Sequence, residues 1–277
     1  MNVNLSNYLA IDRISVLREN WYDAALYFLH RADFLRLLDV RNIQTISILG
    51  TVFSNFGDLN LYYNLLGCAI RIGESLGINN DYTHFSPILP DLQSQRHLWW
   101  SLVILDWLNL PLGQPCINDS DFVVKMPSMG VRSVAESDPC SSNHQSIMAR
   151  IASLLYQFQA SFCASKSWET TGNTVETAET MIAILTTEVT SLAPIPGPGD
   201  AHAQSVDQQP DAFTYDQRHN LLLTLLYNRI LVNRTMVSRQ PSLSSEDIRL
   251  LRCLESAHHI IKICKSMDML HRLPATW

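Results

Sequence analysis

The fold class follows from one stretch of the chain, Leu92 to Leu110, which reads LQSQRHLWWSLVILDWLNL. On a helix, its apolar side chains and two charged ones fall on one stripe, formed by Arg96, Trp99, Val103, Asp106 and Leu110. Trp100 and Trp107 flank that stripe. Pro111 cannot continue a helix, so the sequence predicts an apolar helix that ends at Leu110.

The two charged residues need partners if this stripe is buried. A lone buried carboxylate is costly. Asp106 lies about three turns from Arg96, so its partner must come from another helix or from backbone N–H groups. Arg71, on the preceding helix, is the candidate, and the pair would fix the register of the two helices. The alternative function for these charges is ligand binding.

The helical periodicity extends in both directions from this stretch. Apolar residues recur at helical spacing in the segments 21–29, 49–56, 61–76, 147–162, 182–192, 222–237 and 250–264. Gly57 and Gly77 are placed to end two of these helices. No alternating β-strand pattern is present. The sequence therefore predicts an all-α fold, a single multi-helix domain of roughly eight to ten packed helices without a sheet, over residues 1–277.

The first and last of these helices have well-defined apolar stripes. Trp21, Ala24, Ala25, Phe28 and Leu29 form the stripe of the first helix. In the last helix, Ser244 and Asp247 form a capping-box pattern. Beyond it, steps of four and three residues connect Leu250, Leu254, Ala257, Ile261 and Cys264. Two segments without periodicity, 111–130 and 193–212, are expected to be internal loops.

Composition excludes several functional classes. The chain has 20 Lys and Arg against 26 Asp and Glu, a net charge of −6. The chain as a whole therefore lacks the excess of positive charge that attracts the phosphate backbone of a nucleic acid. The first twenty residues do not form a secretory signal, and no apolar run is long enough to span a bilayer. These observations favour a soluble intracellular protein.

Catalytic and metal-binding motifs are missing from the sequence. It contains no phosphate-binding glycine loop, no H-E-x-x-H zinc motif and no nucleophile elbow. The Asp119-x-Asp121 pair could bind Mg²⁺, but ordering of the loop by local capping is the favoured role. We therefore expect no catalytic, cofactor-binding or metal-ligating residues; an uncharacterised helical enzyme remains the remote alternative.

Several short elements follow one another in a defined order: Ala69-Ile70-Arg71-Ile72, Leu76-Gly77-Ile78, Arg96-His97-Leu98-Trp99-Trp100, Asp106, Gly113-Gln114-Pro115, Ile117-Asn118-Asp119-Ser120-Asp121 and Pro127. Their order and spacing resemble the middle homology (regulatory) region of fungal binuclear zinc-cluster transcription factors. We call the following the signature residues, with a structural role: Arg71, Gly77, Arg96, Trp99, Trp100, Asp106, Gly113, Pro115, Asp119, Asp121 and Pro127. His97 and Gln114 depart from the family, where arginine is usual.

The resemblance implies a regulatory domain of a nuclear, fungal-specific transcription factor that acts on RNA polymerase II transcription and is not an enzyme. Family members bind DNA through an N-terminal zinc cluster of six closely spaced cysteines. This sequence lacks that cluster, because its six cysteines are 48, 24, 23, 90 and 11 residues apart. The resemblance further implies that the domain is incomplete at both ends, because the family's helical region usually continues further. We expect the chain to hold no zinc and to reach DNA only through an absent N-terminal domain.

The resemblance also implies a set of partners: a second copy of the chain, other transcription regulators and a small-molecule effector, with no membrane contact. The alternative keeps the fold and changes the role. In that reading the chain is a stand-alone helical interaction module, or a truncated relic without DNA binding.

Overall fold

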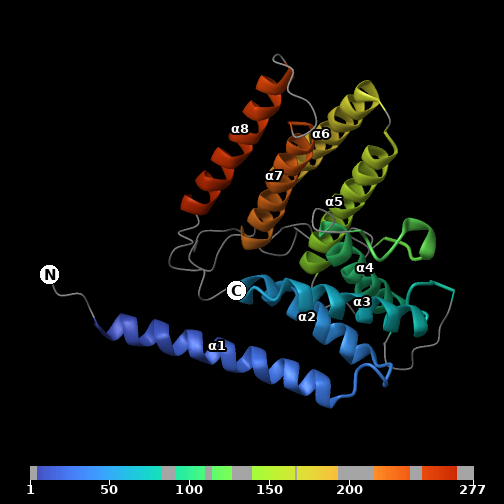
Figure 1. Cartoon of the computed structure of the whole chain (residues 1–277), viewed down its shortest axis with the longest axis vertical. Helices are drawn as coiled ribbons and strands as arrows, with labels where there is room; N and C mark the ends of the chain where they lie inside the picture. Colours follow the sequence, from blue (N-terminus) through green and yellow to red (C-terminus); the bar gives the residue numbers. More distant parts are fainter. Residues whose placement is uncertain are drawn as a thin grey trace, which may run out of the picture. The chain divides into compact units, whose positions relative to one another are not determined.

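The computed structural model describes residues 5–82, 91–109, 114–126, 139–165, 167–192, 215–237 and 245–266. These residues form eight α-helices and no sheet, which confirms the prediction of an all-α fold (Figure 1). Their one extended pairing is an isolated bridge between Asn80 and Val123. Contacts within the chain define two compact units, one up to Ile78 and one that contains residues 79–82 and everything described from residue 91 onwards.

The first unit contains three helices, α1 (Leu5–Arg31), α2 (Val40–Phe56) and α3 (Leu59–Ser75). The carboxylate of Asp39 caps α2 by accepting the backbone N–H of Arg41 at 2.8 Å. Both predicted terminators have left-handed backbone angles: Gly57, with φ of 79°, ends α2, and Gly77, with φ of 71°, follows α3. A side chain in this conformation would be strained, which explains glycine at both positions.

Helices α2 and α3 pack closely because Gly50 has no side chain. A Cβ atom on Gly50 would lie 2.8 Å from Cε2 of Tyr62, too close for a real contact. Helix α1 contributes Tyr22, which stacks on Phe56 with ring centroids 4.3 Å apart. The predicted apolar stripe of α1 is divided: Leu29 is buried, whereas Trp21 and Phe28 are 66% and 68% exposed. Helical spacing identified the apolar residues but not the side that packs.

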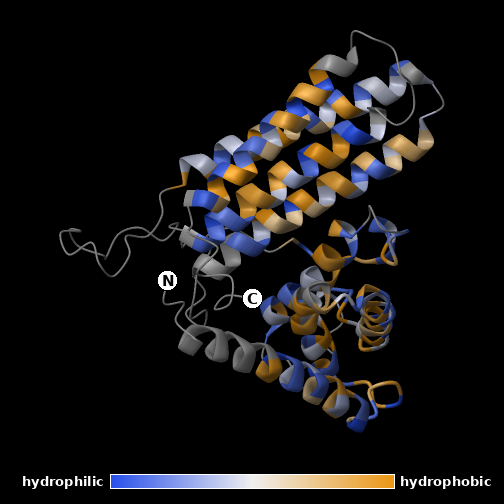
Figure 2. Cartoon of the chain, turned by 60° about the vertical axis from the view of Figure 1, so that its left-hand side comes forward, coloured by the Kyte–Doolittle hydropathy of each residue, from blue (hydrophilic) through white to orange (hydrophobic). Residues whose placement is uncertain are grey.

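The second unit contains the remaining helices: α4 (Leu92–Leu108), the short 3₁₀ helix η2 (Asp119–Asp121), α5 (Pro139–Ala164), α6 (Trp168–Ser191), α7 (Tyr215–Val237) and α8 (Ser245–Ser266). Helix α4 packs on α5, and α5 packs on both α6 and α7. Helix α7 also contacts α6 and α8, so α5 to α8 form a bundle with α8 at its edge (Figure 1). Hydrophobic residues recur along these helices (Figure 2).

The bundle core agrees with the periodicity of the sequence for α5 and α6. Ile147 and Ile151 of α5 and Ile182, Leu185 and Val189 of α6 are all buried. Helix α8 differs, because Leu250, Leu254 and Ile261 of its predicted stripe are 45%, 65% and 52% exposed. Of the two predicted loops, only residues 114–126 fall within the described residues. None of the eight α-helices that the structure describes combines the length and the hydrophobicity that a membrane span requires.

Candidate functional site at helix α4

Helix α4 carries many of the signature residues and starts at a strong cap. The carboxylate of Asp91 accepts the backbone N–H of Ser94 at 2.6 Å, which satisfies one of the N–H groups that a helix start leaves unpaired. This hydrogen bond also holds the pKa of Asp91 below its ordinary value. This cap was not predicted from the sequence, although Asp immediately before the first helical residue is its usual signal.

Arg96, in the second turn of α4, forms a forked ion pair with Asp81. Its Nε lies 3.0 Å from Oδ1 and its Nη2 lies 2.8 Å from Oδ2. Asp81 also accepts the backbone N–H of Lys125 at 3.2 Å. Burial opposes ionisation of this carboxyl, but the guanidinium and the N–H group outweigh it, so the pKa of Asp81 lies below its ordinary value. One carboxylate thus joins residues 79–82, helix α4 and residues 114–126.

Asp106, near the end of α4, is buried and accepts two backbone N–H groups. Its Oδ2 lies 2.9 Å from the nitrogen of Ile117, and its Oδ1 lies 3.2 Å from the nitrogen of Cys116. Burial raises the pKa of Asp106 above its ordinary value, and the two N–H groups offset only part of that rise. The carboxylate fixes the chain just after its departure from α4.

The partner predicted for Asp106 was wrong. Arg71 pairs instead with Glu74 of its own helix, with Nη1 3.0 Å from Oε2, and its side chain is 83% exposed. A flexible arginine on an exposed helix face gains an i,i+3 carboxylate without losing its hydration, whereas burial beside Asp106 would require desolvation. The backbone donors, named as the other possible source, are the observed partners of Asp106.

Two tryptophans of α4 donate their indole N–H groups to the same segment. Trp107 Nε1 donates to the carbonyl of Ile117 at 2.9 Å, and Trp100 Nε1 donates to the carbonyl of Lys125 at 3.1 Å. Phe122 packs against both indoles, with ring centroids 5.7 Å from Trp100 and 6.1 Å from Trp107, and the two tryptophan rings are themselves 6.3 Å apart. These contacts combine large apolar burial with directional hydrogen bonds, which sets one position for residues 114–126.

Residues 79–82 pair with the same segment through backbone and side-chain groups. The N–H of Asp81 donates to the carbonyl of Val123 at 2.9 Å, and the N–H of Val123 donates to the carbonyl of Asn79 at 3.0 Å. From α4, Gln95 Nε2 donates to the carbonyl of Asn80 at 3.0 Å. We call residues 79–82, helix α4 and residues 114–126 together the signature cluster.

Asp119 and Asp121 lie at the surface of the signature cluster in helix η2. The carboxylate of Asp121 accepts the backbone N–H of Asn118 at 3.0 Å and its side-chain amide at 2.9 Å. These hydrogen bonds hold the pKa of Asp121 below its ordinary value. The N–H of Asp119 donates to the hydroxyl of Tyr156 of α5 at 3.3 Å. The carboxylate of Asp121 thus orders its own turn, and the backbone of Asp119 connects that turn to α5.

The remaining signature residues are distributed differently. Trp99 is completely buried and packs edge-on against Phe122 at 5.8 Å. Pro115 is half-buried in the segment that follows α4. Gly113 and Pro127 lie outside the described residues. The charged groups of Asp81, Arg96 and Asp106 bind backbone N–H groups or one another, so the geometry of the signature cluster supports an architectural role.

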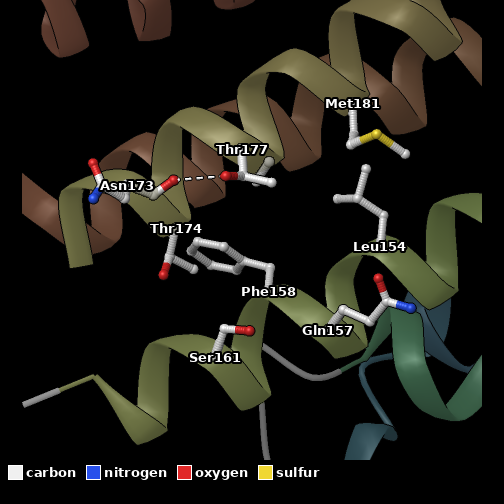
Figure 3. A pocket seen from close by; sticks show the side chains of 9 residues that line it. Leu154, Gln157, Phe158, Ser161, Asn173, Thr174, Thr177 and Met181 are labelled. Carbon is white, nitrogen blue, oxygen red and sulfur yellow. Dashed lines mark hydrogen bonds between the residues drawn. The ribbon is translucent and has the colours of Figure 1, made fainter. Parts of the chain in front are cut away.

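A shallow cavity of about 280 Å³ lies between α5 and α6 (Figure 3). Its lining residues carry no charge: Leu154, Gln157, Phe158, Ser161, Asn173, Thr174, Thr177, Ala178 and Met181. Phe158 reaches toward α6 between hydroxyl and amide groups from both helices (Figure 3). An aromatic face among neutral hydrogen-bonding groups suits a small uncharged molecule. This cavity was not predicted from the sequence, because a space between two helices leaves no local pattern.

A second polar cluster connects α6, α7 and α8. Glu179 of α6 is buried, and its Oε2 lies 3.0 Å from Nε of Arg229 on α7. Its Oε1 accepts the side-chain amide of Asn233 at 2.6 Å. Arg252 of α8 pairs with Glu176 of α6 at 2.9 Å. This network was not predicted from the sequence, because its partners are 50 to 76 residues apart in the chain.

Metal-ligating side chains do not cluster within the part of the chain that the structure describes: no three His, Cys, Asp or Glu residues there could hold one ion. Five cysteines in that part are free thiols, namely Cys68, Cys116, Cys163, Cys253 and Cys264.

Comparison with known proteins identifies the family. The family model described as "Fungal specific transcription factor domain" matches residues 15–168, more than half of the chain, and this range includes every signature residue. The aurofusarin cluster transcription factor aurR2 of Gibberella zeae is 30% identical over 79 residues, which cover 28% of this chain and 12% of that relative. No solved structure matches the chain. The chain belongs to the fungal-specific transcription factor domain family, as a regulatory domain of a fungal transcription factor.

Proposed function

We propose that this domain restrains or directs the DNA-binding and activating parts of a zinc-cluster transcription factor in the nucleus, and that it catalyses no reaction. The family match carries this proposal. The signature cluster supports it, because Arg96, Asp81 and Asp106 use their charges for bonds inside the domain. The chain spans about an eighth of the relative it matches, which leaves room there for further domains. In this proposal, a zinc cluster that is not part of residues 1–277 makes the contact with DNA.

Regulation in this proposal is a change of helix packing that a small effector biases. The α5–α6 cavity is the place we assign to the effector. Its uncharged lining favours a neutral molecule with an apolar body and hydrogen-bonding groups, and disfavours phosphates and carboxylates. An occupant between α5 and α6 would favour one spacing of these two helices, and α7 contacts both.

A reporter assay tests the proposed restraint. The chain is fused between a heterologous DNA-binding domain and a constitutive activation domain in yeast, and reporter output is compared with the same fusion without the chain. We expect several-fold lower output when the chain is present. Trp107→Ala, which removes a buried indole and its hydrogen bond to Ile117, should relieve the restraint. Output that is unaffected by the chain would contradict the proposal.

The effector site has its own matched pair of variants in this reporter. Ser161→Phe places a ring in the α5–α6 cavity, whereas Thr187→Phe adds the same ring on the exposed side of α6, away from that cavity. We expect Ser161→Phe alone to change reporter output, because it mimics an occupant. Equal effects of the two variants would reject the cavity as the effector site.

Exposed apolar side chains favour a second candidate function, a stand-alone helical interaction module. Expression of the unfused chain beside a separate full-length factor of the family distinguishes the two functions. A change in the separate factor's reporter output supports the module, whereas an effect confined to the covalent fusion supports the regulatory domain.

A further inference from the structure

Helix α1 has two apolar sides, and the first unit covers one of them. Tyr22 and Leu29 form the packed side, at 7% and 3% exposure, and Tyr22 stacks on Phe56 of α2. About 120° around the helix, Trp21 and Phe28 are 66% and 68% exposed. Among the residues of the first unit that the structure describes, none buries this second side. Two large aromatic side chains therefore face outward from one helix.

The open side has the spacing of a helix-pairing stripe. Leu17, Trp21, Ala24 and Phe28 follow one another at steps of four, three and four residues, the a and d positions of a heptad. We call these four residues the outer stripe, which runs about 17 Å along α1. Leu17 is 45% exposed, so the outer stripe presents three large side chains, two of them aromatic. Aromatic residues are enriched in contact surfaces, and a straight apolar stripe matches that of a second helix.

The charges beside the outer stripe are basic. Arg31 and Arg18 lie on its two sides, within about 90° of its centre around the helix. Both are exposed, and no carboxylate in the described part of the chain lies within ion-pair distance of either one. Glu19 and Asp23, the acidic residues of segment 16–31, lie more than about 120° from the centre of the stripe. A partner on the outer stripe therefore meets apolar groups between two guanidinium groups.

This charge pattern selects the chemistry of the partner. A second copy of α1 would again bring Arg18 and Arg31 to the rim of the contact, and like charges across an interface are unfavourable. Carboxylates fit this rim, because they accept two parallel hydrogen bonds from one guanidinium group. The complementary surface is thus an apolar stripe with acidic residues on both sides.

We propose that the outer stripe binds an amphipathic helix of a partner protein, in which acidic residues flank the apolar stripe. Trp21 lies near the middle of the contact and anchors it, as buried tryptophans do in many interfaces. Arg18 and Arg31 pair with the flanking carboxylates and set the specificity. A contact of three helical turns is small, so we expect a dissociation constant on the order of 10 µM. The inference does not rest on the proposed role in transcription, because it uses the contacts and charges of the first unit alone.

A designed peptide of this chemistry tests the surface. The peptide has three heptads, with leucine at the a and d positions, glutamate at the e and g positions, and a fluorescein label. Its matched control has lysine in place of every glutamate. Fluorescence anisotropy measures the binding of each peptide to the full chain in about 50 mM salt, where charge contacts are weakly screened. We expect the lysine peptide to bind at least about tenfold more weakly than the glutamate peptide.

Variants of α1 test the residues. Trp21→Glu should weaken binding of the glutamate peptide at least about tenfold, since it removes the central anchor and adds a like charge. Ile184→Glu is the matched control, because Ile184 is a similarly exposed apolar residue on α6, and it should leave binding unchanged. Arg18→Glu combined with Arg31→Glu should reverse the preference in favour of the lysine peptide. Circular dichroism at 222 nm checks that each variant is folded.

The proposal is overturned if the glutamate peptide does not bind at about 100 µM chain, about ten times the expected dissociation constant. Equal binding of the two peptides, or binding that Trp21→Glu leaves intact, would also overturn it. Sedimentation equilibrium and vesicle flotation test the other occupants. Self-association that Trp21→Glu abolishes would assign the outer stripe to a second copy instead, and binding to phosphatidylserine vesicles without binding to the peptide would assign it to a lipid surface.

Discussion

Replacement of Asp106 by alanine tests whether the end of α4 holds residues 114–126 in place. The change removes the acceptor of two backbone N–H groups, at 2.9 Å from Ile117 and 3.2 Å from Cys116. Ile117 is 1% exposed, so in the variant its N–H group loses its acceptor and cannot bind water instead. An unpaired buried N–H group costs about 1–3 kcal/mol. Cys116 is exposed, and its N–H group can bind water at smaller cost.

The expected loss of unfolding free energy for Asp106→Ala is about 2–3 kcal/mol, because removal of a buried carboxylate also relieves part of its own desolvation. For a domain of this size that loss lowers the melting temperature by roughly 4–12 °C. Thermal unfolding followed by circular dichroism at 222 nm measures the change. Asp119→Ala is the control, since the carboxylate of Asp119 is at the surface and should contribute within about 0.5 kcal/mol.

The pH dependence of this loss has a definite sign. The folded-state pKa of Asp106 is raised, so its stabilising contribution is fully present below the unfolded value and declines as pH rises through the folded value. Asp106→Ala should therefore cost more near pH 3, below the ordinary aspartate pKa of 3.8, than near pH 8. A melting temperature that falls no further in Asp106→Ala than in Asp119→Ala would refute the assigned role.

Three further predictions follow from other contacts. The pKa of Asp81 is lowered in the folded chain, so its ionised form stabilises the fold above the unfolded-state pKa, and Asp81→Asn should lose this stabilisation. The difference in unfolding free energy between the variant and the unmodified chain should therefore shrink as pH falls toward about 2. A difference that stays constant across the acid titration would contradict the pairing with Arg96. Glu179→Ala leaves Arg229 without its buried carboxylate and should cost about 3–5 kcal/mol, against less than about 1 kcal/mol for Glu169→Ala at the exposed start of α6; equal melting temperatures for the two variants would argue against the α6–α7 network. The chain alone, with its net charge of −6, should bind DNA only non-specifically, at about 10⁻⁴ M or weaker in physiological salt; submicromolar, sequence-selective binding in fluorescence anisotropy would reject this prediction.

Local sequence signals predicted the helices well. Gly57 and Gly77 indicated two helix ends, because the chain adopts left-handed backbone angles there and glycine adopts these angles without strain. The spacing of Ile182, Leu185 and Val189 predicted the buried side of α6 because that side faces a continuous core. Helix α4 was expected to end at Leu110 and ends at Leu108, two residues earlier.

Long-range partners could not be predicted in the same way. The predicted stripe of α8 is apolar, yet Leu254 in that stripe is exposed. Periodicity shows on which side of a helix apolar residues lie, but it does not show whether another element packs against that side. Asp106 was correctly expected to need a partner, but backbone N–H groups leave no mark in a sequence. Glu179 and Arg229 are 50 residues apart, so no local pattern connects them.

Sequencing of the full-length transcript through both ends tests the central claim most directly. The family assignment predicts an upstream region in the same reading frame that encodes six closely spaced cysteines and a basic linker, followed by the sequence described here. An in-frame stop codon immediately upstream of Met1 would contradict a role for this chain within a DNA-binding regulator, and would leave the separate interaction module as its function.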